Sequence, residues 1–324
     1  MAIKHLHINI ILILIFIISC GGGDKAVTPD PLTPDVTYIP GQHYGDTLGY
    51  IDYLVGNTPI IITVPHDGTL TPSTIPDRTS GVTTRDINAQ KVAERFAYFF
   101  VQRSGGLFPH VIVSNLHRTK LDPNREVVEA AQGNVGAVQA YNAYHTFIQT
   151  AIDTVETYFD SGVLLDLHGH GHDIQRLELG YLLDSNDLDL GNVQINAPTY
   201  VAKSSISQIA SLSAGTFSEV LRGPTSFGGL IVTKSYSYSS AGSGTDVYTF
   251  DAVPSSTTAS PGTDPYFSGG YTTTTYAVGE INVIQIEANY DRARETARGY
   301  GALASAIEEA LFDFYREHTG QPIY

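Results

Sequence analysis

Four short runs of almost continuous apolar residues constrain the fold of this chain more than any other feature. They read PIIITVP at 59–65, PHVIVSNL at 109–116, VLLDL at 163–167 and EINVIQIEAN at 280–289. A strand that is buried on both faces has such an unbroken run, whereas a strand with one face in water alternates apolar and polar residues. The runs therefore predict buried strands of the kind that parallel sheets contain.

Helical patterns separate or follow these runs. Residues 86–103 place their apolar side chains on one helix face, with Asp86 at the expected N-cap position. Residues 126–159 indicate a helix with a break near 133–136, and residues 291–317 a long amphipathic helix. A β-α-β-α-β order predicts an α/β fold in which helices cover both faces of a mostly parallel sheet.

The first 40 residues have the pattern of a targeting segment and a tether. Residues 1–20 combine a basic start, an apolar run and a small residue before Cys20, which is typical of a secretory signal. The letters IISC followed by GGG resemble a bacterial lipoprotein signal, which implies that Cys20 carries lipid; an ordinary signal with a stray cysteine is the alternative. Residues 21–40 are rich in glycine and proline and predict a flexible tether.

The lipoprotein resemblance implies a location in the bacterial cell envelope, with the membrane contacted through the lipid anchor alone. We expect the outer membrane, because Gly21 directly after Cys20 is unlike an inner-membrane retention signal. Whether the protein faces the periplasm or the cell surface stays open.

Residues 41–324 are expected to form a single α/β domain. Within it, the stretch 223–279 is rich in Ser, Thr, Gly and Tyr, which predicts long loops with one hairpin. The net charge of −15 argues against a nucleic-acid partner, because no basic stripe is present to neutralise phosphates. Cys20 is the only cysteine, so the domain has no disulfide, thiolate metal site or catalytic cysteine.

Polar side chains stand at or just after the ends of all four predicted strands. His66, Arg118, His168 and Glu287 hold these places, and His168 begins the tract HGHGH. Ligands bind beyond the carboxyl ends of strands in open α/β sheets, and neutral imidazole is a common zinc ligand. Two histidines and a carboxylate around one zinc ion, a further carboxylate as base and an arginine for the oxyanion would make a mononuclear zinc hydrolase. A second arginine would bind a substrate carboxylate in bidentate fashion.

Five motifs in order resemble the N-formylglutamate amidohydrolase family, from the wider clan of the zinc carboxypeptidases. They are VPHDG, TTRDINAQKVAERF, HRTKLDPNRE, LLDLHGH and VIQIEANYD. In the third, Asp122, Asn124 and Arg125 stand 4, 6 and 7 residues after Arg118, as the family pattern asks. The motifs span most of the domain. The resemblance implies a three-layer α/β/α fold with a mixed sheet and an amidohydrolase activity.

The resemblance also implies roles for individual residues, with one zinc ion per chain. It makes Glu287 the general base and acid, and Arg118 the group that polarises the carbonyl. The remaining roles are zinc ligation by His66, His168 and Asp86, and binding of the substrate carboxylate by Asn124 with Arg125. Asp67 is the other candidate for the carboxylate ligand; it is less favoured because adjacent residues on an extended chain point apart.

The sequence departs from the family in the tract after His168 and in its lipoprotein signal. His170 and His172 are open to four interpretations: polar loop residues, supports for the ligands, substrate contacts or an extra ligand. An envelope location favours a peptide, an N-acyl amino acid or a cell-wall fragment with a free carboxylate as substrate.

Three other functions remain as alternatives. The first is a non-catalytic ligand-binding lipoprotein on the same fold, which would have no use for the base Glu287. The second is an esterase or deacetylase that acts through the same zinc site. The third is a serine hydrolase using His168 and Asp166, which the absence of a Gly-x-Ser-x-Gly motif between a strand and a helix disfavours.

Overall fold

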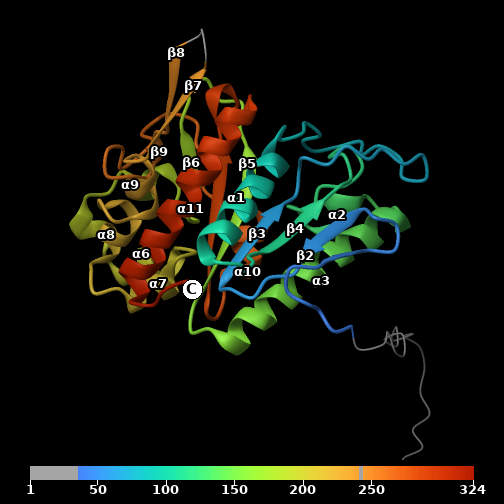
Figure 1. The fold of residues 1–324 in the computed structure, drawn as a ribbon, viewed down its shortest axis with the longest axis horizontal. Coiled ribbons are helices and arrows are strands. Elements are labelled where there is room, and N and C mark those ends of the chain that lie inside the picture. The colour runs from blue at the N-terminus through green and yellow to red at the C-terminus, as the bar shows by residue number, and fades with distance from the viewer. Residues whose placement is uncertain (1–35, 241–243) are drawn as a thin grey trace, which may run out of the picture. The chain divides into compact units, whose positions relative to one another are not determined.

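A mixed sheet, eight-stranded within the described residues, forms the centre of the unit Tyr38–Tyr324 (Figure 1). The structure is a computed structural model that describes residues 36–240 and 244–324. The expected signal at 1–20 with Cys20, and the tether up to residue 35, lie outside the described residues. In the described ranges, we find no helix with the length and apolar character needed to cross a membrane.

The four predicted strands lie side by side and parallel at the middle of the sheet. The strand order is β1 (His43–Gly45), β2 (Ile51–Leu54), β4 (His110–Ser114), β3 (Ile60–Val64), β5 (Gly162–Gly169), β10 (Ile281–Ala288), β6 (Leu177–Gly180) and β9 (Ala252–Val253). Pairs β4–β3, β3–β5, β5–β10 and β6–β9 are parallel, and the other three are antiparallel. The expected mostly parallel mixed sheet is confirmed.

Both faces of the central strands are buried, which explains their unbroken apolar runs. Ile60 and Ile62 pack into the core that contains α1 (Ala89–Ser104) and α11 (Ala297–Thr319). Ile61, between them, packs into a second core with α3 (Val135–Tyr158) on the opposite face (Figure 1). Since successive side chains of a strand point to opposite faces, one apolar run supplies both cores. The three-layer α/β/α architecture is therefore confirmed.

Shorter elements complete the unit. The break predicted within residues 126–159 separates α2 (Val127–Ala131) from α3. After β6 come five short helices, α4 (Ser185–Leu188), α5 (Asn192–Ile195), α6 (Pro198–Lys203), α7 (Ser207–Leu212) and α8 (Phe217–Arg222).

Two helix starts differ from the sequence expectation. Helix α1 begins at Ala89 after Asn88, so Asp86 lies before the helix and does not cap it. Its carboxylate instead faces two histidines, as described below. Helix α11 begins at Ala297, because residues Tyr290–Arg294 form an irregular turn of π type.

The stretch 223–279 contains more structure than its composition predicts. The expected hairpin is present as β7 (Ser235–Ser240) and β8 (Gly244–Thr249), at the top of Figure 1. The stretch also forms α9 (Phe227–Ile231) and α10 (Tyr271–Tyr276), and its strand β9 joins the main sheet. Buried residues such as Phe227 and Val253 anchor these elements, although the surrounding Ser and Thr hide them from a periodicity argument.

Candidate metal centre and active site

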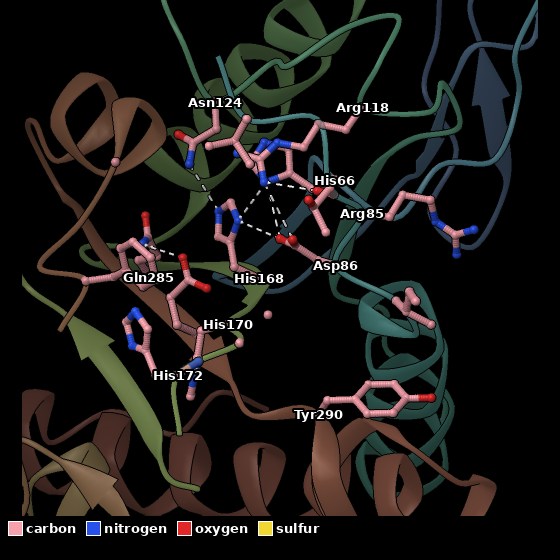
Figure 2. Close-up of a pocket in the computed structure, with 18 of the residues that line it drawn as sticks. His66, Arg85, Asp86, Arg118, Asn124, His168, His170, His172, Gln285 and Tyr290 are labelled. Carbon is pink, nitrogen blue, oxygen red and sulfur yellow. Dashed lines mark hydrogen bonds and ion pairs between the residues drawn. The ribbon is translucent and has the colours of Figure 1, made fainter. Parts of the chain in front are cut away.

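The carboxyl ends of the parallel strands bring the predicted polar residues to one cavity of about 590 Å³ (Figure 2). His66 follows β3, His168 is the penultimate residue of β5, and Arg118 follows β4. Glu287 of β10 is paired with His168 in the parallel register. These four residues, which the sequence placed at separate strand ends, all line the cavity together with Asp86.

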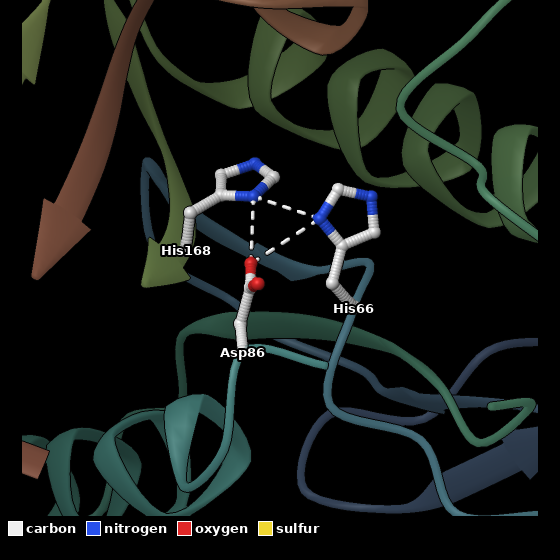
Figure 3. Close-up of side chains that lie close together, drawn as sticks. All are labelled: His66, Asp86 and His168. Carbon is white, nitrogen blue, oxygen red and sulfur yellow. Dashed lines mark hydrogen bonds and ion pairs between the residues drawn. The ribbon is translucent and has the colours of Figure 1, made fainter. Parts of the chain in front are cut away.

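Three possible ligand atoms converge at the base of this cavity (Figure 3). Nδ1 of His66 and Nδ1 of His168 lie 3.1 Å apart, and Oδ2 of Asp86 lies 3.2 Å from each. All three side chains are buried. A backbone hydrogen bond from the Asp86 N–H to the carbonyl of His66 holds the segment before α1 against the first histidine. We call these residues the His–Asp–His group.

The far nitrogen of each imidazole donates to its own buried carboxylate. Nε2 of His66 lies 2.6 Å from Oδ1 of Asp122, and Nε2 of His168 lies 2.8 Å from Oδ2 of Asp166. An ionised carboxylate only accepts hydrogen bonds, so this network assigns the imidazole protons to Nε2. The lone pairs of both Nδ1 atoms then face the Asp86 carboxylate, an arrangement that requires a positive charge between them.

The titration of these groups points to the same requirement. Burial opposes a charge on His168, yet the carboxylates of Asp166 and Asp86 outweigh it and raise its pKa well above the ordinary value. Burial likewise opposes ionisation of Asp86, but the adjoining imidazoles of His168 and His66 outweigh it and hold the pKa of Asp86 well below its usual range. The centre therefore attracts one positive charge, which either an extra proton or a metal ion supplies.

The chemistry of the donor set fits a metal ion. Two imidazole nitrogens and one carboxylate oxygen are a common ligand set, and metal-bound histidines usually donate their other N–H to a carboxylate. The pairs His66–Asp122 and His168–Asp166 have this arrangement. The His–Asp–His group could therefore hold a metal ion.

The structure separates the two candidates for the carboxylate ligand. Asp67 is turned away from the histidines: its Oδ1 accepts from Nη2 of Arg85 at 2.7 Å, and its Oδ2 from the backbone N–H of Gln90 at 2.9 Å. Both partners lie near the start of α1, where the helix favours a negative charge. Asp86 alone of the two reaches both histidines.

Glu287 lines the cavity beside the His–Asp–His group without belonging to it. Burial raises its pKa to about 7, against the opposing effect of His168. Its Oε1 accepts a hydrogen bond from Nε2 of Gln285 at 3.1 Å. A carboxyl group that titrates near neutral pH is suited both to accept and to return a proton.

The predicted arginines stand at different places on the cavity wall. Arg118 donates from Nε to Asp122 at 3.0 Å, and its Nη1 lies 3.6 Å from Oδ1 of Asp86, while its Nη2 has no acceptor among the described residues. Arg125 is half-exposed, forms an ion pair with Glu129 and donates from Nη1 to the backbone carbonyl of Asn124.

Asn124 is more enclosed than its predicted role requires. Its Oδ1 accepts the backbone N–H of Thr272 at 2.8 Å, and its Nδ2 lies 3.2 Å from Nε2 of His168. Gly270 passes so close to this amide that a side chain at position 270 would meet it. The protein itself therefore uses the amide oxygen of Asn124. Arg125, the other residue predicted to bind the substrate carboxylate, is not enclosed in this way.

The histidines after His168 are not equivalent. His170 donates from Nε2 to the carbonyl of Arg176 at 2.8 Å and accepts at Nδ1 from the backbone N–H of His172 at 3.1 Å. Burial lowers the pKa of His170, so it is a neutral imidazole with both nitrogens in use. His170, His172 and Glu178 lie close enough together to be a second group that could hold a metal ion. Both ring nitrogens of His170 are already hydrogen-bonded to backbone groups, so His170 has no nitrogen left for a metal.

Three residues to which the zinc-hydrolase interpretation of the sequence gave no role complete the site. Asp166 precedes His168 by two positions in β5, and the alternation of a strand places the two side chains on the same face. Asp122 belongs to the motif that begins at Arg118, but nothing in that spacing indicates its contact with His66. Arg294 enters the cavity from the turn before α11, where the sequence predicted regular helix. Its Nε donates to the carbonyl of Ala288 at 3.0 Å and its Nη1 to that of Ile87.

Comparison with known proteins gives a likeness in structure only. No model of a known protein family and no curated protein matches the sequence. The chain is similar to a crystal structure of a gene product from Agrobacterium tumefaciens, with 14% identity and a TM-score of 0.43 over 81% of this chain and 93% of that one. It is also similar to N-formylglutamate amidohydrolase from Ralstonia eutropha, with 14% identity and a TM-score of 0.42 over 79% and 92%. The second bears the name of the family that the sequence motifs resemble.

Proposed function

We propose that this protein is a zinc-dependent hydrolase that cleaves an amide bond. The observation that carries the proposal is the His–Asp–His group with its two supporting carboxylates, placed beside a buried glutamate that is not part of it. Zinc in catalytic sites takes three protein ligands of these types and keeps a further position open. An N and O ligand set at a hydrolytic site favours zinc among divalent metals.

The residues divide the reaction between them. Bound zinc supplies Lewis acidity, which polarises a substrate carbonyl and lowers the pKa of a water molecule. Glu287 removes a proton from the attacking water as the new C–O bond forms, and returns it to the nitrogen as the C–N bond breaks, so that an acid and an amine leave. Arg118 lines the cavity, and its guanidinium stabilises the negative charge that develops on the carbonyl oxygen.

For the substrate we propose a small anion, either an N-acyl amino acid or a peptide with a free carboxylate. The charged residues of the cavity lining support this choice. Four arginines line the cavity, Arg85, Arg118, Arg125 and Arg294. They outnumber the two carboxylates of the lining, Asp86 and Glu287, in a chain whose net charge is −15. Such a local field attracts an anion to an otherwise acidic protein. We assign the substrate carboxylate to Arg125, with Asn124 beside it.

The first experiment measures metal content in purified wild-type protein, His168→Ala and His43→Ala. Wild type and His43→Ala, which changes an exposed histidine, are expected to hold about one zinc ion per chain, and His168→Ala to lose it. A panel of N-acyl amino acids, peptides and the corresponding esters then tests hydrolysis. A wild-type protein that takes up no zinc on titration overturns the proposal. Ligand binding without hydrolysis by a zinc-loaded protein would instead favour the non-catalytic binding function.

We also propose, from the sequence alone, that residues 1–20 direct the chain to the cell envelope and that Cys20 is lipidated. The IISC–GGG pattern supports this location. Labelling with a fatty-acid analogue in a bacterial host, for wild type and Cys20→Ala, is the test. Label on wild type and none on Cys20→Ala is the expected result, and equal label on both would contradict it.

A further inference from the structure

Two stacked rings form part of the cavity wall near Glu287. His172 and Phe267 lie with their ring centroids 4.8 Å apart and an interplanar angle of 15°. Figure 2 shows His172 on the same side of the His–Asp–His group as Gln285, away from Arg85. His172 comes from the HGHGH tract and Phe267 from the 223–279 stretch, so two sequence features without a role in the proposed reaction meet here. We call His172 and Phe267 the ring pair.

One buried carboxylate holds both members of the ring pair. Oε1 of Glu178 accepts from Nδ1 of His172 at 2.8 Å, and its Oε2 accepts from the backbone N–H of Phe267 at 2.9 Å. Glu178 is completely buried. Burying a carboxylate is costly unless it is hydrogen-bonded, and here both oxygens are used to fix the two rings.

The sheet places this carboxylate next to the proposed base. Glu178 of β6 is directly opposite Glu287 of β10 in the antiparallel register. Directly opposite residues project from the same face of a sheet. The ring pair is therefore fixed to the sheet at the position adjacent to the reacting end of the cavity, rather than to a separate surface.

Both members of the ring pair line the cavity. Phe267 is 43% exposed, and Nε2 of His172 has no hydrogen-bond partner among the described residues. Other large apolar residues with substantial exposure also line the cavity, namely Val82, Ile87 and Tyr290. Exposed apolar side chains gathered around a concave site mark a contact surface for a ligand.

Resting on the proposed amide hydrolysis, we propose that the ring pair is a subsite for an aromatic or large aliphatic group of the substrate. Glu178 is its positioning residue. The cavity of about 590 Å³ lies within the range of roughly 300–1,000 Å³ that holds drug-sized ligands. The preferred substrates are thus amides that combine a carboxylate with a bulky apolar group. That group is either the amino-acid side chain or the acyl group, since both present the same chemistry to the rings.

Binding measured without turnover tests the subsite. Calorimetry on zinc-loaded Glu287→Gln protein compares N-acetylglycine with N-acetylphenylalanine and N-benzoylglycine. Burial of an aromatic ring is expected to tighten binding of at least one aromatic ligand about tenfold or more. N-acetylphenylalanine alone gaining affinity identifies the side chain as the group bound, and N-benzoylglycine alone identifies the acyl group.

Variants of the ring pair should remove this preference. Adding Phe267→Ala to the same background is expected to make the three affinities equal, whereas Val193→Ala, at an 85% exposed valine that does not line the cavity, leaves the preference intact. Phe267→Leu is a second variant in case the alanine form does not fold. Equal or undetectable binding of all three ligands, or a preference that survives both Phe267 variants, overturns the subsite.

Hydrolysis assays on the wild-type background separate a positioning role of Glu178 from a purely structural one. Glu178→Gln is expected to raise KM for the aromatic substrate about tenfold or more and KM for N-acetylglycine by much less, so that the ratio of the two KM values changes. Equal losses for both substrates would contradict the positioning role. If wild type hydrolyses none of the amides but the binding preference is present, the proposed function fails and the subsite stands.

Discussion

At the scale of single residues, the carboxylate that each histidine contacts through Nε2 decides which way its other nitrogen can bind. Asp122 and Asp166 each accept the Nε2 proton of one histidine and so leave both Nδ1 lone pairs directed at Asp86. Burial opposes the charge on Asp122, but His66 and then Arg118 outweigh it and keep its pKa well below the usual range. The orientation of the candidate ligands therefore depends on residues outside the His–Asp–His group.

Replacing Asp122 by Asn tests this dependence. Asp122→Asn keeps an acceptor for His66 but removes the charge, and we expect metal affinity to fall about 10–100-fold, as for other such supporting groups. Competition with a chromophoric chelator measures the change. Asp77→Asn, at an exposed aspartate paired with Lys120, is the matched control and should bind metal as wild type does. Equal affinity in Asp122→Asn would show that His66 needs no carboxylate.

Replacing Glu287 by Gln distinguishes the proposed base from the proposed metal ligands. Because Glu287 is not in the His–Asp–His group, Glu287→Gln should retain the metal while turnover falls by about 100-fold or more. Metal content and initial rates on the same preparation provide the measurement. Loss of the metal would make Glu287 a ligand, and full activity would place the base elsewhere.

At the scale of elements, the end of β5 is fixed by a glycine rather than by its apolar run. A methyl group on Gly169 would overlap the guanidinium of Arg294, which donates to the carbonyls of Ala288 and Ile87. Arg294 thus joins β10, the segment before α1 and the turn before α11. The close approach of strand and guanidinium requires a residue without a side chain at position 169.

Gly169→Ala is accordingly expected to lower the free energy of unfolding by about 1–3 kcal/mol, the usual cost of overpacking a buried site. Urea unfolding gives the value. Gly171→Ala is the control, because no atom would meet a methyl group at position 171, and its effect should stay within about 0.5 kcal/mol. Combining Gly169→Ala with Arg294→Ala should relieve part of the cost; strictly additive effects would argue against this contact.

At the scale of the whole molecule, histidines buried in the neutral form couple stability to pH. Burial lowers the pKa of His110 and of His145 to about 4. His110 accepts at Nδ1 from the hydroxyl of Tyr53, and its Nε2 has no partner among the described residues. In the unfolded chain a histidine has a pKa near 6.5. The unfolded state therefore binds protons first as the pH falls, so this stability is complete above about pH 6.5 and is lost toward pH 4.

Comparison of wild type with His110→Asn isolates one such group. Between its folded and unfolded pKa values, a histidine with a lowered pKa reduces the free energy of unfolding by about 1.4 kcal/mol for each pH unit of acidification. Between pH 6 and pH 4.5 the free energy of unfolding of wild type should therefore fall by about 2 kcal/mol more than that of the variant. Urea unfolding in the presence of a chelator measures both proteins without a contribution from metal binding. His43→Asn, at an exposed histidine, should follow wild type. Parallel pH profiles for His110→Asn and wild type would contradict the assignment.

The sequence by itself determined the layers of the fold and the edge at which polar residues gather. The unbroken runs of β3 and β5 require two buried faces, and the helical periodicities between them supply the covering layers. Because parallel strands end at one edge, the positions of His66, His168 and Glu287 at strand ends were enough to predict that they lie together. The local sequence pattern is enough to predict a strand or helix when the same kind of buried contact recurs along its length.

Only the tertiary structure decided how those residues are held and what else joins them. Asp122 reaches His66 across 56 residues, and Glu178 reaches the backbone of Phe267 across 89. Arg294 reaches the carbonyl of Ile87 across 207. These contacts depend on the path of loops and of an irregular turn, which carry no periodicity in the sequence. The strand ends thus follow from local hydrophobic pattern, whereas the charges that orient the ligands and the rings that border the cavity follow from long-range packing.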